Sequence, residues 1–411
     1  MPNKSNKITI NQWFYNTVKS LLRLWLENNF NLEADIPEEI KNLKPPYLIL
    51  PNHQGFWDPF MAGIYLKRRI FYIASDAIFR SPFFGLLMRL LGVIPKTKAQ
   101  SDIDALKNIF RVKERGDVIG IFPEGRRTWD GVTLPLVFST SKLIRMLKVP
   151  VVVVVFKGGF FSQPRWGFHI QKGKVFMEYK ILFRGDEVKS MKVESIHKKL
   201  AEALSFNEYE YQDKVAVKYT GRKPAEYLEK VLYTCPSCNT IGTMFSKGKM
   251  FSCTKCNYEL EYNLIRKFES SKNKVFFDNI RDWNLWQQKN LHSLLDNSLI
   301  DGKTVFKDEN LIFHTGYKSE KLQNLTHGSL HLVRSLSADL LIIKNSMGEE
   351  VKSFPLTELT GTNIQNKERL EFYYQNTLYT IKGKFKRFSA YKWLNAVEYL
   401  LLDKTSQFQA E

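Results

Sequence analysis

The sequence predicts an α/β domain built on a mostly parallel sheet covered by helices, followed by a small cysteine-rich module and a β-rich C-terminal domain capped by a helix. Three patterns support this prediction. Short apolar runs of strand length alternate with helical segments up to about residue 205. All four cysteines then fall between Cys235 and Cys256. Beyond about residue 301, alternating apolar and polar residues indicate short strands.

The overall composition limits the class of protein. A chain of 411 residues is long enough for two or three domains, and 44% hydrophobic with 25% charged residues is typical of folded proteins. The net charge of +19 favours anionic partners, which include nucleic acid, acidic lipid surfaces and phosphorylated substrates. There is neither an apolar run of 18 residues nor a secretory signal, so we expect a cytoplasmic protein without a transmembrane helix.

The N-terminal residues 8–30 predict an amphipathic helix. Its apolar positions recur at helical spacing and are Phe14, Val18, Leu21, Leu22 and Trp25. Aromatic rings in the same segment suit a lipid–water interface. We therefore expect contact with an anionic membrane surface. Packing of this helix on its own domain is the alternative, and both can hold together.

The next elements alternate between strands and helices. Strands are expected at about residues 47–50, 70–74, 118–122 and 151–156, and helices at 59–68, 101–114, 137–147 and 192–205. This alternation is typical of a largely parallel sheet covered by helices.

A histidine and an aspartate follow the first of these strands. In the segment from Pro51 to Phe60, His53 precedes Asp58 with four residues between them. Asp58-Pro59 is a typical helix start, with Asp as the N-cap. The loop can then fold back and set the Asp58 carboxylate against one imidazole nitrogen of His53, which is the arrangement that a general base needs. The alternative is a helix cap beside an ordinary loop histidine.

A second motif follows the buried strand at 118–122. It reads Phe122-Pro123-Glu124-Gly125-Arg126-Arg127-Thr128. Gly125 permits a tight turn, and adjacent arginines offer forked donors suited to a phosphate. An exposed basic loop is the alternative.

Together the two motifs resemble the glycerolipid acyltransferase family, the lysophosphatidic acid acyltransferase-like enzymes. His53 and Asp58 match its His-x4-Asp motif, and residues 122–125 with Arg127 and Thr128 match its Phe-Pro-Glu-Gly-(Thr)-Arg-Ser motif. Residues 92–94 with Lys98, and residues 149–152, resemble two shorter motifs. The resemblance covers residues 45–205.

This sequence departs from the family pattern at three places. Arg126 stands where threonine is usual, Lys98 where arginine is usual, and residues 153–154 are valines where a second proline is usual. The first two changes affect the cationic region and not the base. A lysine offers a point charge in place of a planar fork.

The resemblance implies acyl transfer from acyl-CoA or acyl carrier protein to the hydroxyl of a phosphate-bearing glycerolipid, in phospholipid biosynthesis at the cytoplasmic face of a membrane. The protein would be peripheral or monotopic and would need no catalytic cofactor. His53 would act as the base and Asp58 would orient it. The acceptor phosphate would contact Glu124, Gly125, Arg126, Arg127 and Lys98. Glycerol 3-phosphate, lysophosphatidic acid and other lysolipids remain open as acceptors.

The four cysteines form two Cys-x2-Cys pairs. Cys235 and Cys238 precede Cys253 and Cys256 by a spacing close to that of a four-cysteine zinc site. Four thiolates leave no open coordination position, so the expected zinc is structural. This segment resembles a zinc ribbon. Two disulfides, or iron in a rubredoxin-like site, are the alternatives.

The tail from residue 301 resembles a pleckstrin-homology or GRAM-like domain, at the level of its pattern. Strands are expected at 340–344, 350–354, 369–374 and 377–382, before a helix at 389–401. The basic segment 382–387 suits anionic headgroups, and a solvated basic loop is the alternative.

The chain is thus expected to contain six segments. They are an amphipathic membrane-contact region at 1–44, an acyltransferase domain at 45–205, a connector at 206–231, a zinc ribbon at 232–262, a helical linker at 263–300 and a PH/GRAM-like domain at 301–411. The alternative function is a non-catalytic lipid- or nucleic-acid-binding zinc-ribbon protein with a degenerate acyltransferase domain. A nucleic-acid-binding protein would not need the two ordered motifs, so nucleic acid is not the expected partner.

Overall fold

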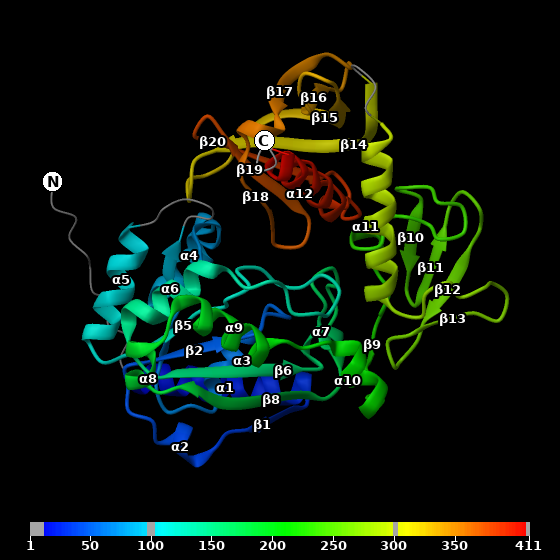
Figure 1. The fold of residues 1–411 in the computed structure, drawn as a ribbon. Coiled ribbons are helices and arrows are strands. Elements are labelled where there is room, and N and C mark those ends of the chain that lie inside the picture. Colours follow the sequence, from blue (N-terminus) through cyan, green and yellow to red (C-terminus); the bar gives the residue numbers. More distant parts are fainter. Residues whose placement is uncertain (1–11, 97–102, 299–302, 408–411) are drawn as a thin grey trace. The chain divides into compact units, whose positions relative to one another are not determined.

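The computed structural model describes residues 12–96, 103–298 and 303–407 (Figure 1). These residues divide into two compact units. The first unit contains residues 12–96, 103–222 and 264–266, and the second contains 223–263, 267–298 and 303–407. The two sequence motifs lie in the first unit and the four cysteines in the second.

The first unit is built on a seven-stranded sheet with the order β1-β8-β6-β2-β5-β3-β4. Its strands are β1 (Leu32–Asp35), β2 (Tyr47–Pro51), β3 (Ile70–Ser75), β4 (Ile94–Lys96), β5 (Val118–Gly120), β6 (Val151–Lys157) and β8 (Val175–Phe183). All neighbouring pairs are parallel except β6 and β8, which are antiparallel. The expected mostly parallel sheet is confirmed. A short sheet of β7 (Gln171–Lys172) and β9 (Thr220–Gly221) also belongs to this unit.

Helices cover both faces of this sheet. They are α1 (Gln12–Phe30), α2 (Glu38–Lys41), α3 (Asp58–Ile64), η1 (Asp76–Arg80), α4 (Pro82–Leu90), α5 (Ile103–Glu114), α6 (Phe138–Leu147), α7 (Gly159–Ser162), α8 (Gly185–Ser190), α9 (Val193–Leu204) and α10 (Glu208–Val215). Strand β2 is buried throughout, because Ile49 packs into the core on the α1 side while Leu48 and Leu50 pack into the core on the side of α5, α6 and α9. The carboxyl end of this buried strand is therefore a rigid base for the loop that follows.

Helix α1 buries one side and exposes another. Leu26 and Phe30 are in the core, whereas an apolar face remains in contact with solvent. We call this the α1 apolar face, and it consists of Val18, Leu21, Leu24 and Trp25. The predicted helix began at residue 8, and residues 8–11 lie outside the described residues. Within the part of the chain that the structure describes, no helix combines the length and apolarity needed to cross a bilayer.

The cysteine-containing part of the second unit is a four-stranded antiparallel sheet followed by a helix. The strands are β10 (Met244–Lys247), β11 (Met250–Cys253), β12 (Glu259–Tyr262) and β13 (Phe268–Glu269), preceded by the short η2 (Leu228–Lys230) and followed by α11 (Ile280–Asp296). Trp283 of α11 is fully buried, has its ring centroid 5.4 Å from that of Phe251 and donates from Nε1 to the Thr234 carbonyl at 2.9 Å. The cysteine hairpins are thus packed on a helix.

The C-terminal part is a seven-stranded antiparallel sheet with the order β17-β16-β15-β14-β20-β19-β18. Its strands are β14 (Lys303–Gly316), β15 (Gln323–Arg334), β16 (Leu340–Asn345), β17 (Glu350–Pro355), β18 (Thr360–Gln365), β19 (Arg369–Tyr374) and β20 (Thr377–Gly383), with η3 (Leu356–Glu358) and the final helix α12 (Ala390–Gln407). The expected β-rich region with a closing helix is present. Its assignment to a PH or GRAM family remains a prediction.

Candidate active site

The loop after β2 folds back around the Asp58 carboxylate. Asp58 Oδ2 lies 2.9 Å from His53 Nδ1 and also accepts hydrogen bonds from the N–H groups of Gln54, at 2.6 Å, and Gly55, at 2.8 Å. Asp58 is the first residue of α3, and the N-cap is Trp57, which makes no side-chain cap hydrogen bond. The expectation that Asp58 caps its own helix is therefore wrong, because the carboxylate serves the preceding loop.

This geometry fixes the state of the imidazole. Because a carboxylate accepts at Nδ1, the neutral ring carries its proton there, and Nε2 is the nitrogen with a lone pair. The His53 side chain is 18% exposed and that of Asp58 only 3%. A partly accessible imidazole with a fixed tautomer can accept a proton from a bound hydroxyl.

The second motif holds the backbone of His53 from both sides. The His53 N–H donates to Glu124 Oε1 at 2.6 Å, and the His53 carbonyl accepts from the Thr128 N–H at 3.0 Å. The His53 ring also stacks on Phe122, with ring centroids 4.0 Å apart. The two sequence motifs, some seventy residues apart in the chain, therefore form one structure.

Glu124 has a buried carboxylate that joins two loops. Its second oxygen accepts from the Leu134 N–H at 2.7 Å. Burial raises the pKa of Glu124 to about 8, against the opposing effect of these backbone hydrogen bonds. The sequence predicted a phosphate contact for this residue. In the structure its described hydrogen bonds go to protein N–H groups, which indicates a role in positioning His53.

The arginine turn lies beside the imidazole. Gly125 has a φ of +67°, which a side chain would strain, and the half-buried Arg126 and Arg127 follow it. Burial lowers the pKa of the Arg127 guanidinium, and the Asp58 charge opposes that effect. Lys98, the remaining predicted phosphate ligand, lies outside the described residues.

The charges around His53 act on its pKa in opposite directions. Burial lowers this pKa most strongly, hydrogen bonding and charge attraction from Asp58 raise it, and the positive charges of Arg127 and Arg165 lower it. The net pKa lies below the ordinary histidine value. The imidazole is therefore neutral at physiological pH, as a general base must be.

Several residues that support this loop were not identified from the sequence. The Asn52 amide pairs with the Phe156 backbone through both of its ends, at 3.2 and 2.7 Å, and so extends the β2–β6 pairing. Gln54 donates to the Phe156 carbonyl at 3.0 Å and accepts from Phe160 N–H at 3.2 Å. Side-chain amides that pair with distant backbone groups form no recognisable spacing pattern in a sequence. The position of Asn52 and Gln54 on either side of His53 was the one available sign of their role.

The segment after β6 contributes two further buried side chains. Glu208, at the start of α10, accepts from the Gly158 N–H with both oxygens, at 2.9 and 2.8 Å. Arg165 donates from Nη1 to the Arg127 carbonyl at 2.9 Å, and its guanidinium lies 4.3 Å from the Trp129 ring centroid. No motif marks either residue, because their partners are distant in the chain.

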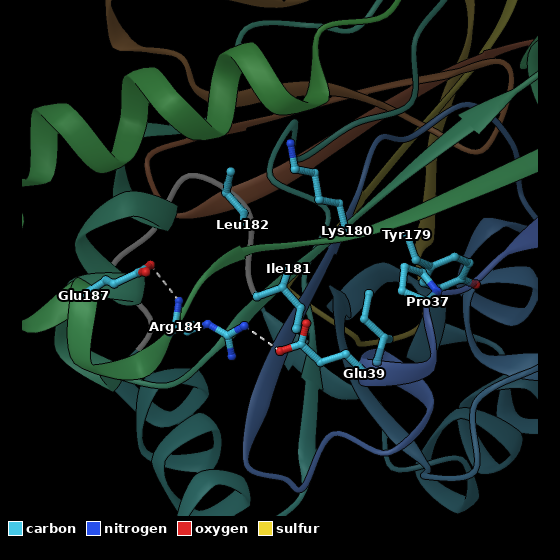
Figure 2. Close-up of a pocket in the computed structure, with 9 residues that line it drawn as sticks. Pro37, Glu39, Tyr179, Lys180, Ile181, Leu182, Arg184 and Glu187 are labelled. Atoms are coloured by element: carbon cyan, nitrogen blue, oxygen red, sulfur yellow. Dashed lines mark hydrogen bonds and ion pairs between the residues drawn. The ribbon is translucent and has the colours of Figure 1, made fainter.

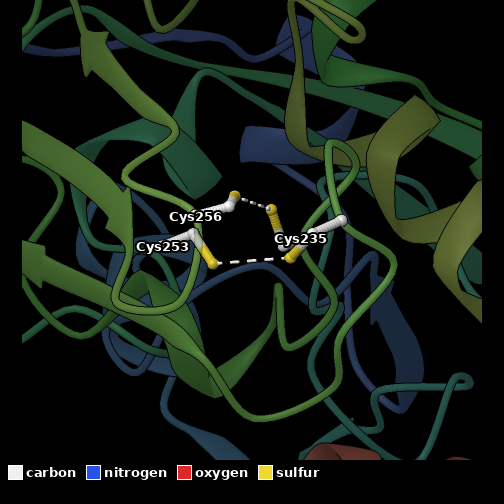
Figure 3. A group of neighbouring side chains, drawn as sticks. Cys235, Cys253 and Cys256 are labelled. Carbon is white, nitrogen blue, oxygen red and sulfur yellow. Dashed lines mark hydrogen bonds between the residues drawn. The ribbon is translucent and has the colours of Figure 1, made fainter.

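The four predicted metal ligands of the second unit are close together. Cys235 and Cys256 have sulfurs 3.7 Å apart, those of Cys238 and Cys253 are 3.8 Å apart, and all four sulfurs lie within 4.8 Å of one another (Figure 3). Four sulfurs at about 2.3 Å from a tetrahedral ion would be about 3.8 Å from each other. The cluster therefore fits a single ion of that size.

A separate cavity of about 290 Å³ lies between α2 and β8 (Figure 2). Residues that line it include Ile40, Tyr179 and Lys180, together with Arg184 and Glu39, which form an ion pair at 2.6 Å. None of the predicted site residues lines it. We assign it no function.

Known proteins resemble the first unit. Residues 30–157 match the model of a family described as acyltransferase. The 1-acyl-sn-glycerol-3-phosphate acyltransferase of Saccharomyces cerevisiae is 29% identical over 160 residues, which cover 38% of this chain and 50% of that protein. The enzyme of the same name from Bacillus subtilis is 26% identical over 113 residues, covering 27% of this chain and 56% of that protein. The chain thus spans about half the length of these relatives.

A solved structure is also similar. It is the 1-acyl-sn-glycerophosphate acyltransferase of Thermotoga maritima, with 19% identity and a TM-score of 0.41 over 47% of this chain and 76% of that chain. The sequence similarities and the match of residues 30–157 together support the glycerolipid acyltransferase family for the segment that carries His53, Asp58 and the arginine turn.

Proposed function

We propose that this protein moves a fatty acyl group from acyl-CoA or acyl carrier protein to the hydroxyl of a phosphate-bearing glycerolipid, of the lysophosphatidic acid type. The observation that carries the proposal is the fixed His53–Asp58 pair beside Arg127, in which Glu124 and Thr128 hold the backbone of His53. The similarity to 1-acylglycerol-3-phosphate acyltransferases is consistent with it.

The proposed reaction is direct acyl transfer. His53 Nε2 removes the proton from the acceptor hydroxyl as the oxygen attacks the thioester carbonyl. Asp58 stabilises the resulting imidazolium. The carbon–sulfur bond of the tetrahedral intermediate then breaks, the imidazolium proton passes to the departing thiolate, and the products are an ester and a thiol. No residue of the chain is acylated at any step of this reaction.

The acceptor phosphate is assigned to the arginine turn. Gly125, Arg126 and Arg127 supply backbone and guanidinium donors suited to it, and Lys98 is retained from the sequence motif. Glu124 is assigned a supporting role in the loop, because its two carboxylate oxygens accept hydrogen bonds from the N–H groups of His53 and Leu134.

An acceptor panel tests this function. Labelled palmitoyl-CoA and palmitoyl carrier protein are each offered with glycerol 3-phosphate, lysophosphatidic acid and other lysolipids. A labelled diacyl product with lysophosphatidic acid is the expected result. Salt-sensitive DNA binding without any acylated product would instead support the nucleic-acid-binding alternative, and lipid binding without product would support a degenerate domain.

The pH dependence follows from the lowered pKa of His53. Only the neutral imidazole is a base, so kcat/KM falls as the pH drops through the His53 pKa, and burial places that pKa below about 6.5. We therefore expect full kcat/KM at pH 7 and an acid limb with its midpoint below about 6.5. The affinity for the acceptor, measured without acyl donor over the same pH range, shows how much of the change in kcat/KM comes from ionisation of the acceptor phosphate. A midpoint above 7 would contradict the proposed base.

We further propose that the α1 apolar face rests on an anionic membrane at its cytoplasmic side. Leu21 and Leu24 are 63% and 65% exposed. Trp25 lies against Trp57 of the catalytic loop, with ring centroids 4.6 Å apart, and Phe56 of the same loop is 44% exposed. This apolar surface therefore continues from α1 to the residues between His53 and Asp58.

Charge substitution tests this surface. Leu24→Glu adds a charge to the apolar face and removes one leucine contact, so partitioning onto phosphatidylglycerol-containing vesicles should weaken about 10-fold or more. Ile103→Glu on α5 is the matched control, since Ile103 is 63% exposed. Vesicle sedimentation measures both variants. Equal partitioning of wild type and Leu24→Glu would contradict the assignment.

We also propose that the four cysteines hold one structural zinc ion in a ribbon at 232–262. When bound, zinc supplies tetrahedral cross-linking and no chemistry at His53. The remaining segment boundaries proposed from the sequence are 1–44, 45–205, 206–231, 263–300 and 301–411, with a PH/GRAM-like domain in the last.

A further inference from the structure

Glu208 is a fully buried acid in a segment that the sequence predicted to be a connector. It is the first residue of α10, is 0% exposed and lies downstream of residues 30–157. Burial of a carboxyl group costs free energy unless hydrogen bonds compensate it. The hydrogen-bond partners of this side chain therefore indicate what it does.

The Glu208 side chain binds the turn that follows β6. Both of its carboxyl oxygens accept from the Gly158 N–H, at 2.9 and 2.8 Å, and Oε1 also lies 3.4 Å from the Phe160 nitrogen. Gln54 Oε1 accepts from the same Phe160 N–H at 3.2 Å. Glu208 and the loop that carries His53 therefore share one backbone donor.

Gln54 connects this turn to the catalytic pair. Its side-chain amide is held at both ends, because Nε2 donates to the Phe156 carbonyl at 3.0 Å. Its main-chain N–H donates to Asp58 Oδ2 at 2.6 Å, and that oxygen lies 2.9 Å from His53 Nδ1. The position of Gln54 thus determines where the Asp58 carboxylate meets the imidazole.

The turn after β6 packs tightly against the Gln54 amide. A Cβ atom at Gly159 would lie 2.6 Å from Gln54 Oε1, which is closer than side-chain carbons approach other atoms in proteins. Glycine at this position therefore lets the backbone of the turn lie directly on the amide. A displacement of the turn would move Gln54 with it.

The start of α10 is itself fixed to the segment after the arginine turn. The Glu208 N–H donates to the Gly131 carbonyl at 3.0 Å. Next to this contact, Val132 pairs with Asn207 in an antiparallel bridge. Glu208 is thus held by its backbone on one loop and holds a second loop with its side chain, as a rigid support for a catalytic group requires.

We propose that Glu208 is a positioning residue for the His53–Asp58 pair, acting through the turn after β6 and through Gln54. This inference rests on the proposed function, in which the pair removes the acceptor proton. The effect of Glu208 on the imidazole is indirect, through the position of Asp58 Oδ2. A misplacement of about 1 Å can lower the rate of an enzyme ~100-fold.

Two substitutions separate the reach of the Glu208 side chain from its acidity. Burial raises the pKa of Glu208 to about 8, against the opposing effect of its hydrogen bonds, so the neutral acid predominates at pH 7. Glu208→Gln keeps the length of the side chain and an oxygen that accepts from the Gly158 N–H. Glu208→Asp keeps the acid but withdraws it by one methylene, so that contact is lost.

Steady-state acyl transfer from palmitoyl-CoA to lysophosphatidic acid measures the effect. We expect Glu208→Asp to lower kcat about 10-fold or more, because the catalytic pair is displaced. The KM for the acceptor should change less than about 3-fold, since no acceptor contact is removed. Glu208→Gln should keep most of the wild-type kcat. The control Glu202→Ala removes an exposed acid of α9 and should change neither constant.

Nuclear magnetic resonance of the imidazole tests the same link without substrate. The signal of the His53 Nδ1–H proton, which is donated to Asp58, is assigned in protein labelled in its histidine rings by its absence from His53→Ala. Displacement of Asp58 should shift this signal or lose it to exchange with water. We expect a changed signal in Glu208→Asp and the wild-type signal in Glu208→Gln. Thermal unfolding checks that each variant is folded.

The outcomes have distinct meanings. A wild-type kcat or a wild-type His53 signal in folded Glu208→Asp overturns the proposal, and so does an equal loss of kcat in Glu208→Asp and Glu208→Gln. If wild type forms no acyl product but its His53 signal changes in Glu208→Asp, the proposed function falls and the positioning role stands. If Glu208→Asp does not fold, Gly159→Ala replaces it and should cause the same losses, because its methyl group displaces the Gln54 amide.

Discussion

His53→Ala should lower kcat for acyl transfer at least ~100-fold, which is the scale of lost general-base catalysis. The variant removes the only imidazole that contacts Asp58 in the described residues and leaves the Glu124 and Thr128 contacts to the residue 53 backbone intact. The fold should therefore survive. Single-turnover transfer from labelled palmitoyl-CoA to lysophosphatidic acid measures the chemical step.

Two further variants sharpen this result. His169→Ala removes an exposed histidine of the same unit and should retain wild-type turnover. Asp58→Asn removes the charge that stabilises the imidazolium while conserving the side-chain shape, so its kcat should also fall. Thermal unfolding of each variant checks that the fold persists. Near-normal turnover by folded His53→Ala would refute the proposed base.

The spacing of His53 and Asp58, taken together with the second motif, predicted that the two side chains meet, whereas the spacing alone left a helix cap beside a loop histidine as the alternative. A separation of five positions, in a loop between a buried strand and a helix start, allows few loop conformations. The structure brings His53 Nδ1 and Asp58 Oδ2 to 2.9 Å. The same spacing did not predict which N–H groups the carboxylate binds. A cap and a loop closure both place an aspartate at a helix start, and only the loop conformation distinguishes Gln54 and Gly55 from the helix's own donors.

Long-range partners limited the prediction of the site. The family resemblance implied that Glu124 contacts the acceptor phosphate. Its carboxylate accepts from the N–H groups of His53 and Leu134, and only the folded loops show these contacts. Arg165 and Glu208 had no sequence signal, since each acts on a segment more than thirty residues away. From sequence alone, charged residues in a loop-rich segment are expected to lie in solvent, because charged side chains are seldom buried.

The C-terminal sheet shows a related limit. Four of its strands were predicted from alternation and separating turns. The longer β14 and β15 were not, because register shifts between Thr304 and Phe306 and between Asp308 and Leu311 interrupt the alternation of their side chains. Strands that contain such bulges are recognised only once the strands that pair with them are known.

Native protein should contain about one zinc ion per chain, and loss of that ion should unfold the cysteine hairpins. The described residues of the ribbon form only short strands around the four sulfurs, so metal binding supplies much of their stability, on the order of 10 kcal/mol in isolated zinc-binding peptides. The sulfur–sulfur distances of 3.7 and 3.8 Å suit four thiolate ligands and are far longer than a disulfide bond.

Unfolding of the hairpins should reach beyond the cysteines. The N–H groups of Tyr233 and Thr234 donate to Gln287 of α11, and the Thr234 carbonyl accepts from Trp283. Arg387, next to α12, pairs with Glu229 just before the first knuckle. Because these contacts join the segment before the first knuckle to α11 and to the residues just before α12, a strong chelator should change the near-ultraviolet circular dichroism and lower the Tm of the second unit.

Cys253→Ser tests the same point without a chelator. Cys253 is buried and its sulfur lies 3.2 Å from the Thr243 hydroxyl, so the variant should lose the metal and most of the stability of the hairpins. Ser237→Ala changes an exposed residue between the first two cysteines and should keep both. Elemental analysis separates zinc from iron. Two results together would contradict the prediction: native protein that contains neither zinc nor iron, and hairpins that melt at the same temperature in native protein and in Cys253→Ser. The four cysteines would then be held together by packing on α11 alone.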